Sequence, residues 1–360
     1  WNDYDLDDWE SSSAYCIIQT NENLFSFKAD SPCTHRMRKK NVLAPMVVTI
    51  SVYKGHLSEG FGNQEPLAGV EVERWYMAPG VRRIPVTEDG LTGTLFLPSG
   101  PGPFPGLLDL WGGGIQLVEY RAALLASHGI ATMALDYLTF AKLTQSHSSF
   151  EPSTPPTAFK FLQKHPKVLS SRMAMLGLSL GTSITLRMAV CSEVTKFRCV
   201  VCISGSHVQP MDGFLKETVD YFLKNSGKTR FTKDDEAIWR DLLLPIPSDP
   251  SLKVDMEIEM FLPVLLTQDF IHYFKTGNSH LLTLLSYPKA GHLIEPPYTP
   301  HTRASLFRDV RSRQTMMALW GGQTLEHSRA QEDAWRKLLV FLRTNLYGGV
   351  KPGASSLSNL

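Results

Sequence analysis

The fold of this chain is decided by residues 173–182, which read Met-Ala-Met-Leu-Gly-Leu-Ser-Leu-Gly-Thr. The apolar run before the first glycine predicts a buried strand, and apolar residues at helical spacing after the second predict a helix over Thr182–Ser192. Glycine lets the backbone turn tightly where a side chain would clash. A Gly-x-Ser-x-Gly sequence at such a strand-to-helix turn presents its serine hydroxyl above the edge of a sheet. Ser179 is therefore a candidate nucleophile.

The composition predicts a globular protein. The chain has 360 residues, of which 43% are hydrophobic and 20% charged, so it can bury a sizeable core. The net charge of +1 gives no reason to expect a nucleic acid partner. No apolar run approaches the roughly eighteen residues that a membrane-spanning helix needs, so we expect no stable membrane insertion. The five cysteines lack metal-ligand spacing, and we expect Cys199 and Cys202 to be packed, reduced thiols in an intracellular compartment.

Residues 1–85 contain strand-like segments and no convincing helix. Residues 46–53 are rich in β-branched side chains, and residues 70–76 alternate apolar with charged side chains. The segment is short for a complete sandwich, which usually needs about seven strands. We therefore predict a small, incomplete β domain here, with an atypical stretch over residues 1–32.

Residues 86–347 alternate strand-like with helix-like runs, which predicts a mostly parallel sheet with helices on both faces. The charged, helix-prone residues 205–260 interrupt this pattern and suggest an inserted cap, and residues 348–360 suggest a flexible tail. The strand-like runs are Gly106–Trp111, Ile130–Tyr137, Arg172–Leu178, Cys199–Ser204, Leu262–Thr267 and Leu281–Tyr287, and the helix-like runs are Leu117–Ser127, Thr157–Lys164, Thr182–Ser192 and Gln331–Leu346.

A nucleophilic serine needs a base and a third group that orients the base. In α/β-hydrolases these follow the serine in the order acid, then histidine. His292 follows the late strand-like run Leu281–Tyr287, where such a base belongs, and Asp269 follows Leu262–Thr267, at the sheet edge where functional groups collect. We predict Ser179, Asp269 and His292 as the triad. Asp255, Glu257 and Glu259 are alternatives for the acid.

The oxyanion of a tetrahedral intermediate needs backbone N–H donors. We expect one donor at Leu180, directly after the nucleophile, as in other hydrolases with this turn. The second should come from Gly112-Gly113-Gly114, a glycine loop after the first long strand-like run. Gly113 is the favoured donor, and its two neighbours stay open.

Several blocks of this sequence are similar to one known family. On these blocks, between about Arg36 and Phe341, the chain resembles the acyl-CoA thioesterase and bile acid-CoA:amino acid N-acyltransferase family. The most specific block is Ser286–Tyr298, and the others are Tyr76–Arg83, Gly93–Pro98, Val118–Ala122, Trp320–Gly322 and Ala330–Trp335.

The resemblance implies an immunoglobulin-like β domain followed by an α/β-hydrolase domain that attacks the thioester of an acyl-CoA. It also implies that transferases of this family carry cysteine as nucleophile and thioesterases carry serine, so Ser179 favours hydrolysis. The sequence around His292 is somewhat closer to the transferases. The chain departs from the family where two adjacent aspartates are expected and Asp269-Phe270 stand instead, with a shortened segment before His292.

Four functions therefore compete. We expect an acyl-CoA thioesterase; the alternatives are an acyltransferase to glycine or taurine, a non-catalytic acyl-CoA binder with an impaired triad, and a general carboxylesterase. We expect no metal and no cofactor, since CoA is part of the substrate, and we favour a monomer. The terminal Ser358-Asn359-Leu360 resembles a weak peroxisomal signal, so we expect the cytosol or the peroxisome.

Overall fold

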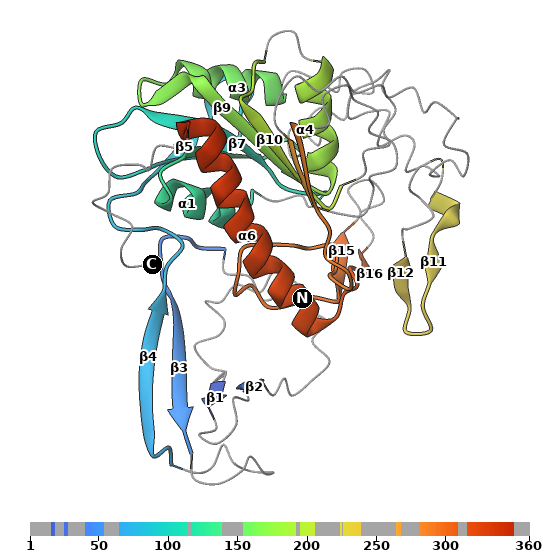
Figure 1. Ribbon diagram of the computed structural model, residues 1–360. Coiled ribbons are helices and arrows are strands. Elements are labelled where there is room, and N and C mark those ends of the chain that lie inside the picture. The colour runs from blue at the N-terminus through green and yellow to red at the C-terminus, as the bar shows by residue number, and fades with distance from the viewer. Residues whose placement is uncertain are drawn as a thin grey trace.

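The computed structural model describes residues 16–18, 25–27, 40–53, 65–113, 117–138, 154–191, 195–205, 224, 226–238, 264–267, 281–308 and 315–348. Among these residues the chain forms three sheets and four α-helices (Figure 1). The predicted tail and most of residues 1–32 lie outside these ranges.

An eight-stranded sheet forms the centre of the molecule, in the order β14-β13-β10-β9-β7-β8-β6-β5. Every neighbouring pair from β8 to β14 is parallel, and β6 is antiparallel to both β8 and β5. The predicted mostly parallel α/β sheet is confirmed. Its strands are β5 (Arg82–Val86), β6 (Gly93–Leu97), β7 (Phe104–Leu110), β8 (Ala131–Leu135), β9 (Val168–Leu178), β10 (Cys199–Ile203), β13 (Val264–Thr267) and β14 (Leu282–Leu285).

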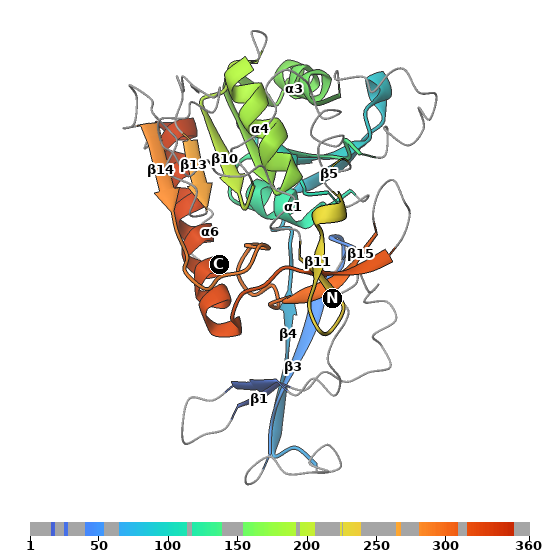
Figure 2. The ribbon, with the colours of Figure 1, turned by 90° about the vertical axis from the view of Figure 1, so that its right-hand side faces the viewer.

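Helices cover both faces of this sheet (Figure 2). Successive side chains of a strand point to opposite faces, so Leu107 packs into the core beneath α1 and α6, and Leu108 into the core beneath α3 and α4. A strand buried on both faces must be apolar throughout, which is why the central strands read as continuous apolar runs. The helices are α1 (Tyr120–Ser127), α3 (Thr154–Lys164), α4 (Leu180–Cys191) and α6 (Thr324–Tyr347).

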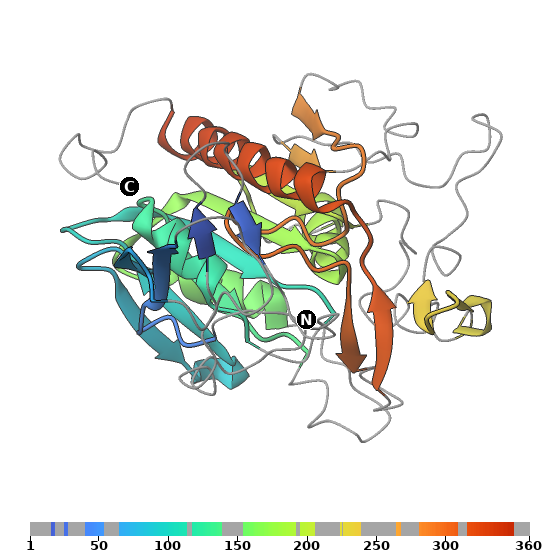
Figure 3. The same cartoon turned by 90° about the horizontal axis from the view of Figure 1, so that it is seen from below.

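Helix α6 runs along one face of the sheet (Figure 3). Its buried side chains recur every three or four residues, and it ends at Gly348, whose φ of 67° suits glycine. The helix begins at Thr324, seven residues before the predicted start at Gln331. The prediction missed its first turns because His327 and Gln331 are polar yet buried, so they break the apolar pattern.

The N-terminal strands form a separate four-stranded sheet, in the order β2-β1-β3-β4. Strands β3 and β4 pair as a ribbon that extends away from the α/β body (Figure 1). Strand β5 belongs to the central sheet and begins at Arg82, so that sheet starts before the predicted boundary at residue 86. The bounds of this first sheet are β1 (Cys16–Ile18), β2 (Phe25–Phe27), β3 (Met46–Val52) and β4 (Ala68–Arg74).

A third sheet joins part of the predicted cap to the C-terminal region, in the order β11-β12-β16-β15. Where residues 205–260 are described they form a short hairpin, because the Thr232 hydroxyl accepts the backbone N–H groups of Asp234 and Glu236 and closes the turn. The strands are β11 (Arg230–Phe231), β12 (Glu236–Ile238), β15 (Ala304–Arg308) and β16 (Thr315–Leu319), and two short 3₁₀ turns are η3 (Glu88–Gly90) and η4 (Ser226–Lys228).

Cys199 and Cys202 are free thiols buried in β10, as predicted. Burial raises the pKa of both thiols, which keeps them protonated and unreactive. Within the described ranges, no helix combines the length and the apolar character that crossing a membrane requires.

Candidate active site

Ser179 occupies the sharp turn between β9 and α4. Its φ of 54° lies in the left-handed region, which is uncommon for a residue with a side chain. The turn is fixed on both sides, since the Ser179 N–H donates to the Ile203 carbonyl at 2.9 Å and the Thr182 N–H donates to the Ser179 carbonyl at 2.9 Å. Backbone strain of this kind, at a half-buried serine between a strand and a helix, is typical of a nucleophile elbow.

The two glycines that flank Ser179 are required by close backbone contacts. A methyl group on Gly177 would lie 2.3 Å from the Gly181 carbonyl oxygen. A methyl group on Gly181 would lie 2.5 Å from the carbonyl oxygen of Leu110 and 2.7 Å from that of Trp111. The start of α4 therefore packs directly against the end of β7, where the glycine loop begins.

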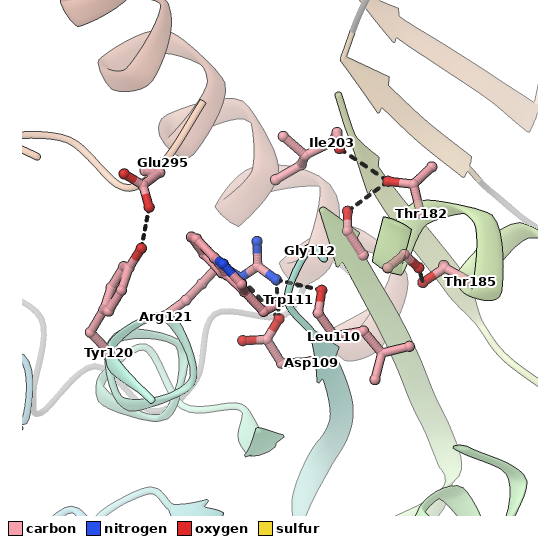
Figure 4. Close-up of polar contacts among 12 residues, drawn as sticks. Asp109, Leu110, Trp111, Gly112, Tyr120, Arg121, Thr182, Thr185, Ile203 and Glu295 are labelled. Atoms are coloured by element: carbon pink, nitrogen blue, oxygen red, sulfur yellow. Dashed lines mark hydrogen bonds and ion pairs between the residues drawn. The ribbon is translucent and has the colours of Figure 1, made fainter. Parts of the chain in front are cut away.

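Threonine hydroxyls hold the first turn of α4 in place. The Thr182 hydroxyl is 3.1 Å from the Gly177 carbonyl oxygen and 3.0 Å from that of Ile203 (Figure 4). The Thr185 hydroxyl donates to the Gly181 carbonyl at 2.9 Å. Leu180, the predicted oxyanion donor, is the first residue of α4, and the first N–H groups of a helix have no partner within the helix.

The glycine loop lies beside the elbow. A methyl group on Gly112 would lie 3.1 Å from Ser179 Cβ, so the space between the loop and the serine is too narrow for a side chain at this position. Gly113, the second predicted donor, follows directly, and Gly114 lies outside the described residues. The Tyr137 hydroxyl donates to the Trp111 carbonyl at 2.6 Å and is 3.3 Å from the Gly112 carbonyl oxygen.

A buried ion pair lies at the base of the glycine loop (Figure 4). The Arg121 Nε donates to Asp109 Oδ1 at 2.9 Å, its Nη2 contacts the same oxygen, and Nη2 also donates to the Leu110 carbonyl at 3.0 Å. The guanidinium lies 5.1 Å from the centre of the Trp111 ring. Burial raises the pKa of the Asp109 carboxyl, and the Arg121 charge opposes that rise. The pair therefore ties α1 to the end of β7.

A second buried contact joins α1 to the segment that follows His292. The Tyr120 hydroxyl donates to the Glu295 carboxylate, and Glu295 is 5% exposed (Figure 4). The Tyr120 ring lies edge-on to Trp111, with the ring centres 5.6 Å apart. Adjacent residues of α1 thus contact both the glycine loop and the histidine segment.

His292 lies seven residues after the end of β14 and is half-buried. Its ring stacks on Trp320 with centres 5.6 Å apart, and its N–H donates to the Trp320 carbonyl at 2.8 Å. The preceding N–H, that of Gly291, donates to His327 Nδ1 at 3.0 Å. His327 is buried in the first turn of α6, so this helix fixes the backbone on which His292 stands.

Aromatic side chains connect the histidine to the glycine loop. Phe307 on β15 lies edge-on to Trp320, with ring centres 6.0 Å apart. The same Phe307 ring would be 3.7 Å from a methyl group on Gly113. The Phe307 ring therefore lies between the glycine loop on one side and Trp320, on which His292 stacks, on the other.

Asp269 and the three alternative acids lie outside the described residues. Strand β13 ends at Thr267, two residues before Asp269. It runs parallel to β10 and β14, so it ends at the same sheet edge as β9, which leads to Ser179. The strand that leads to the predicted acid is thus placed correctly, and the acid's own geometry stays a prediction.

The supporting roles of several polar residues were not predicted, among them those of Asp109, Arg121, Tyr137 and His327. An aspartate within the apolar run Leu107–Leu110 is a usable signal, because a charge in a buried strand requires a partner. No local signal marks the other three. Among the described residues, no cluster of histidine, cysteine or acidic side chains could hold a metal ion.

The sequence of this chain matches models of known protein families. Two models match, described as the BAAT/acyl-CoA thioester hydrolase C-terminal region, over residues 156–267 and 263–348, and the acyl-CoA thioester hydrolase/BAAT N-terminal region, over residues 7–88.

Individual relatives match over most of the chain. Acyl-coenzyme A thioesterase 3 of Mus musculus is 36% identical, over 91% of this chain and 78% of its own. The peroxisomal succinyl-coenzyme A thioesterase of Mus musculus is 34% identical, over 90% and 78%. The bile acid-CoA:amino acid N-acyltransferase (BAAT) of Mus musculus is 36% identical, over 78% and 69%.

Proposed function

Because this chain belongs to the BAAT/acyl-CoA thioester hydrolase family, we propose that it hydrolyses acyl-CoA thioesters to a free fatty acid and CoA. One observation carries the proposal. A serine occupies the strained turn between β9 and α4, close beside a glycine loop that can supply N–H donors. That pair of features is what acyl transfer to an activated serine requires.

The proposed reaction begins with attack of the Ser179 Oγ on the thioester carbonyl carbon. His292 takes the hydroxyl proton, and the N–H groups of Leu180 and Gly113 bind the resulting oxyanion. Collapse of the intermediate breaks the C–S bond, and CoA leaves as a thiol with the proton from His292. A water deprotonated by His292 then attacks the acyl-serine, and the fatty acid departs with Ser179 reprotonated.

Asp269 is the proposed acid that orients His292. The strand order supports this role, because it brings the end of β13 to the sheet edge that carries Ser179 and the His292 segment. Without such an acid the imidazole loses its productive tautomer, and turnover falls by about 10⁴-fold. If the folded protein binds acyl-CoA but shows hardly any turnover, Asp269 would therefore be the triad residue that fails in its role.

Transfer of the acyl group to an amino acid is the second candidate. The 36% identity to a bile acid-CoA:amino acid N-acyltransferase supports it. In that reaction the amine of glycine or taurine, instead of water, attacks the acyl-enzyme and gives an amide. We rank hydrolysis first because position 179 is serine, and an acyl-serine ester is readily hydrolysed by water.

We further propose that acyl-CoA is the only partner the reaction needs. The triad chemistry requires no metal or cofactor beyond the CoA of the substrate, and a monomer suffices for it. A relative described as peroxisomal supports the peroxisome as one location, beside the cytosol.

Thiol release from palmitoyl-CoA tests the proposal, measured on the wild type and on Ser179→Ala, with and without glycine or taurine. The thioesterase predicts release in the wild type, free palmitate as product and no release in Ser179→Ala. An amide product on addition of an amino acid would establish the transferase instead. Release that survives in Ser179→Ala would refute both.

A further inference from the structure

Tyr137 binds the backbone of the glycine loop and has no role in the reaction proposed above. It lies just beyond the end of β8, and its side chain is 5% exposed. Its hydroxyl donates to the Trp111 carbonyl at 2.6 Å and lies 3.3 Å from the Gly112 carbonyl oxygen. Burial raises the pKa of this phenol, so the hydroxyl stays protonated and remains a donor across the physiological pH range.

The position of these two carbonyls determines where the next N–H groups point. In a trans peptide unit the C=O and the following N–H point in opposite directions. The hydroxyl therefore gathers the Trp111 and Gly112 carbonyl oxygens on its own side, and the N–H groups of Gly112 and Gly113 point away from it. Successive N–H groups on one side of a turn form a concavity that binds anions.

The loop would not adopt this orientation on its own. Glycine is free to take up many backbone conformations, so a glycine loop without restraints samples several directions for its N–H groups. Arg121 restrains the loop from α1 by binding the Leu110 carbonyl at 3.0 Å. Tyr137 restrains the next two carbonyls, so two buried side chains hold three successive peptide units.

We propose that Tyr137 is a positioning residue for the oxyanion site, which sets the direction of the Gly113 N–H by binding the carbonyls of Trp111 and Gly112. The proposal rests on the proposed function, because it assigns Tyr137 to the same acyl-transfer site. Tyr137 acts through the backbone and touches no reacting atom. Its contribution should therefore appear in the stabilisation of the tetrahedral intermediate and leave ground-state binding unchanged.

Tyr137→Phe tests this proposal, because the ring still fills its buried space and only the hydroxyl is lost. Tyr347→Phe is the matched control. It removes a hydroxyl that also donates to a glycine carbonyl, that of Gly129 at 2.5 Å, in the turn that precedes β8 at the opposite edge of the sheet. For each protein we would measure kcat and KM with palmitoyl-CoA and the temperature of unfolding.

Two inhibitors separate a positioning role from a structural one. A palmitoyl trifluoromethyl ketone adds to Ser179 and forms an oxyanion, whereas the non-reactive thioether analogue of palmitoyl-CoA only binds. For Tyr137→Phe we expect kcat and ketone affinity each to fall about tenfold, a fraction of the 10²–10³ lost when an oxyanion donor is removed outright. KM and thioether affinity should stay within about twofold, and Tyr347→Phe should match the wild type.

The proposal is overturned if Tyr137→Phe keeps the wild-type kcat and ketone affinity. It is also overturned if thioether affinity falls as much as ketone affinity, or if Tyr347→Phe loses as much activity as Tyr137→Phe. A wild type that releases no thiol would contradict the proposed function alone. The ratio of ketone affinities would still test Tyr137, because addition of the ketone needs the oxyanion site and no thioester.

Discussion

Substituting alanine for Gly181 tests the packing that joins the elbow to the glycine loop. Alanine normally favours a helix over glycine by about 1 kcal/mol, so propensity alone predicts a gain in stability. The added methyl would lie 2.5 Å from the Leu110 carbonyl oxygen and 2.7 Å from that of Trp111, both backbone atoms. Non-bonded heavy atoms prefer about 3.5 Å, so α4 and β7 must separate by roughly 0.5–1 Å.

That separation decides the sign and the size of the effect. Overpacking of this kind costs about 1–3 kcal/mol, which outweighs the helix term. It also moves the Gly112 loop relative to Ser179, and a displacement of about 1 Å in an active site can cost 10²-fold in rate. We expect Gly181→Ala to fold, to unfold at a lower temperature than the wild type, and to lose between about tenfold and a hundredfold in kcat.

The assay is thiol release from palmitoyl-CoA together with thermal unfolding. Gly227→Ala is the control, because no atom lies within 4 Å of a methyl group at that position. It should match the wild type in both measurements. A Gly181→Ala protein with wild-type kcat and undiminished stability would refute the claim that this contact sets the geometry of the site.

Three further changes probe polar groups that are buried or partly buried. His327→Leu removes the acceptor of the Gly291 N–H, so kcat should fall and the free energy of unfolding should drop by about 1–3 kcal/mol. His327→Gln should retain more of the activity and more of the stability, as measured by thiol release and urea unfolding. Equal values for the two variants would contradict a role for this hydrogen bond. Arg121→Met leaves Asp109 buried without its cation, so the free energy of unfolding measured with urea should fall by about 3–5 kcal/mol. Adding Asp109→Leu to the same protein should restore most of this loss, and failure to do so would contradict the importance of the ion pair. His128 follows the last residue of α1 and is partly buried. Desolvation, and secondly the Arg343 charge, lower its pKa from 6.5 to about 4, so the unfolded chain takes up this proton first, and the stability present above pH 6.5 is lost as the pH falls towards 4. In His128→Gln that pH dependence of urea unfolding should be shallower, and an unchanged slope would contradict the assignment.

Local sequence was sufficient for the centre of the fold. Strands β7 to β10 and the turn at Ser179 follow from apolar runs bounded by glycine, because a strand covered on both faces must be apolar along its whole length. The order of Ser179, the strand before Asp269 and the segment of His292 along the chain also agrees with the sheet order that the structure shows.

What the sequence did not predict depends on contacts between distant residues. Strand β12 pairs with β16, about eighty residues further on, and no local periodicity encodes that pairing. Asp109 has its partner on the following helix, and the ring of His327 meets a backbone N–H thirty-six residues earlier. In the sequence such buried polar residues only interrupt an apolar pattern, because their hydrogen-bond partners are distant along the chain.

Covalent labelling is a direct test of whether Ser179 is the nucleophile of an acyl-CoA hydrolase. The purified protein would be treated with an alkyl fluorophosphonate, with and without palmitoyl-CoA, and the labelled peptide identified by mass spectrometry. We expect a single label on Ser179 that palmitoyl-CoA slows and that Ser179→Ala abolishes. A label on another residue, or thiol release that proceeds while Ser179 stays unlabelled, would contradict it.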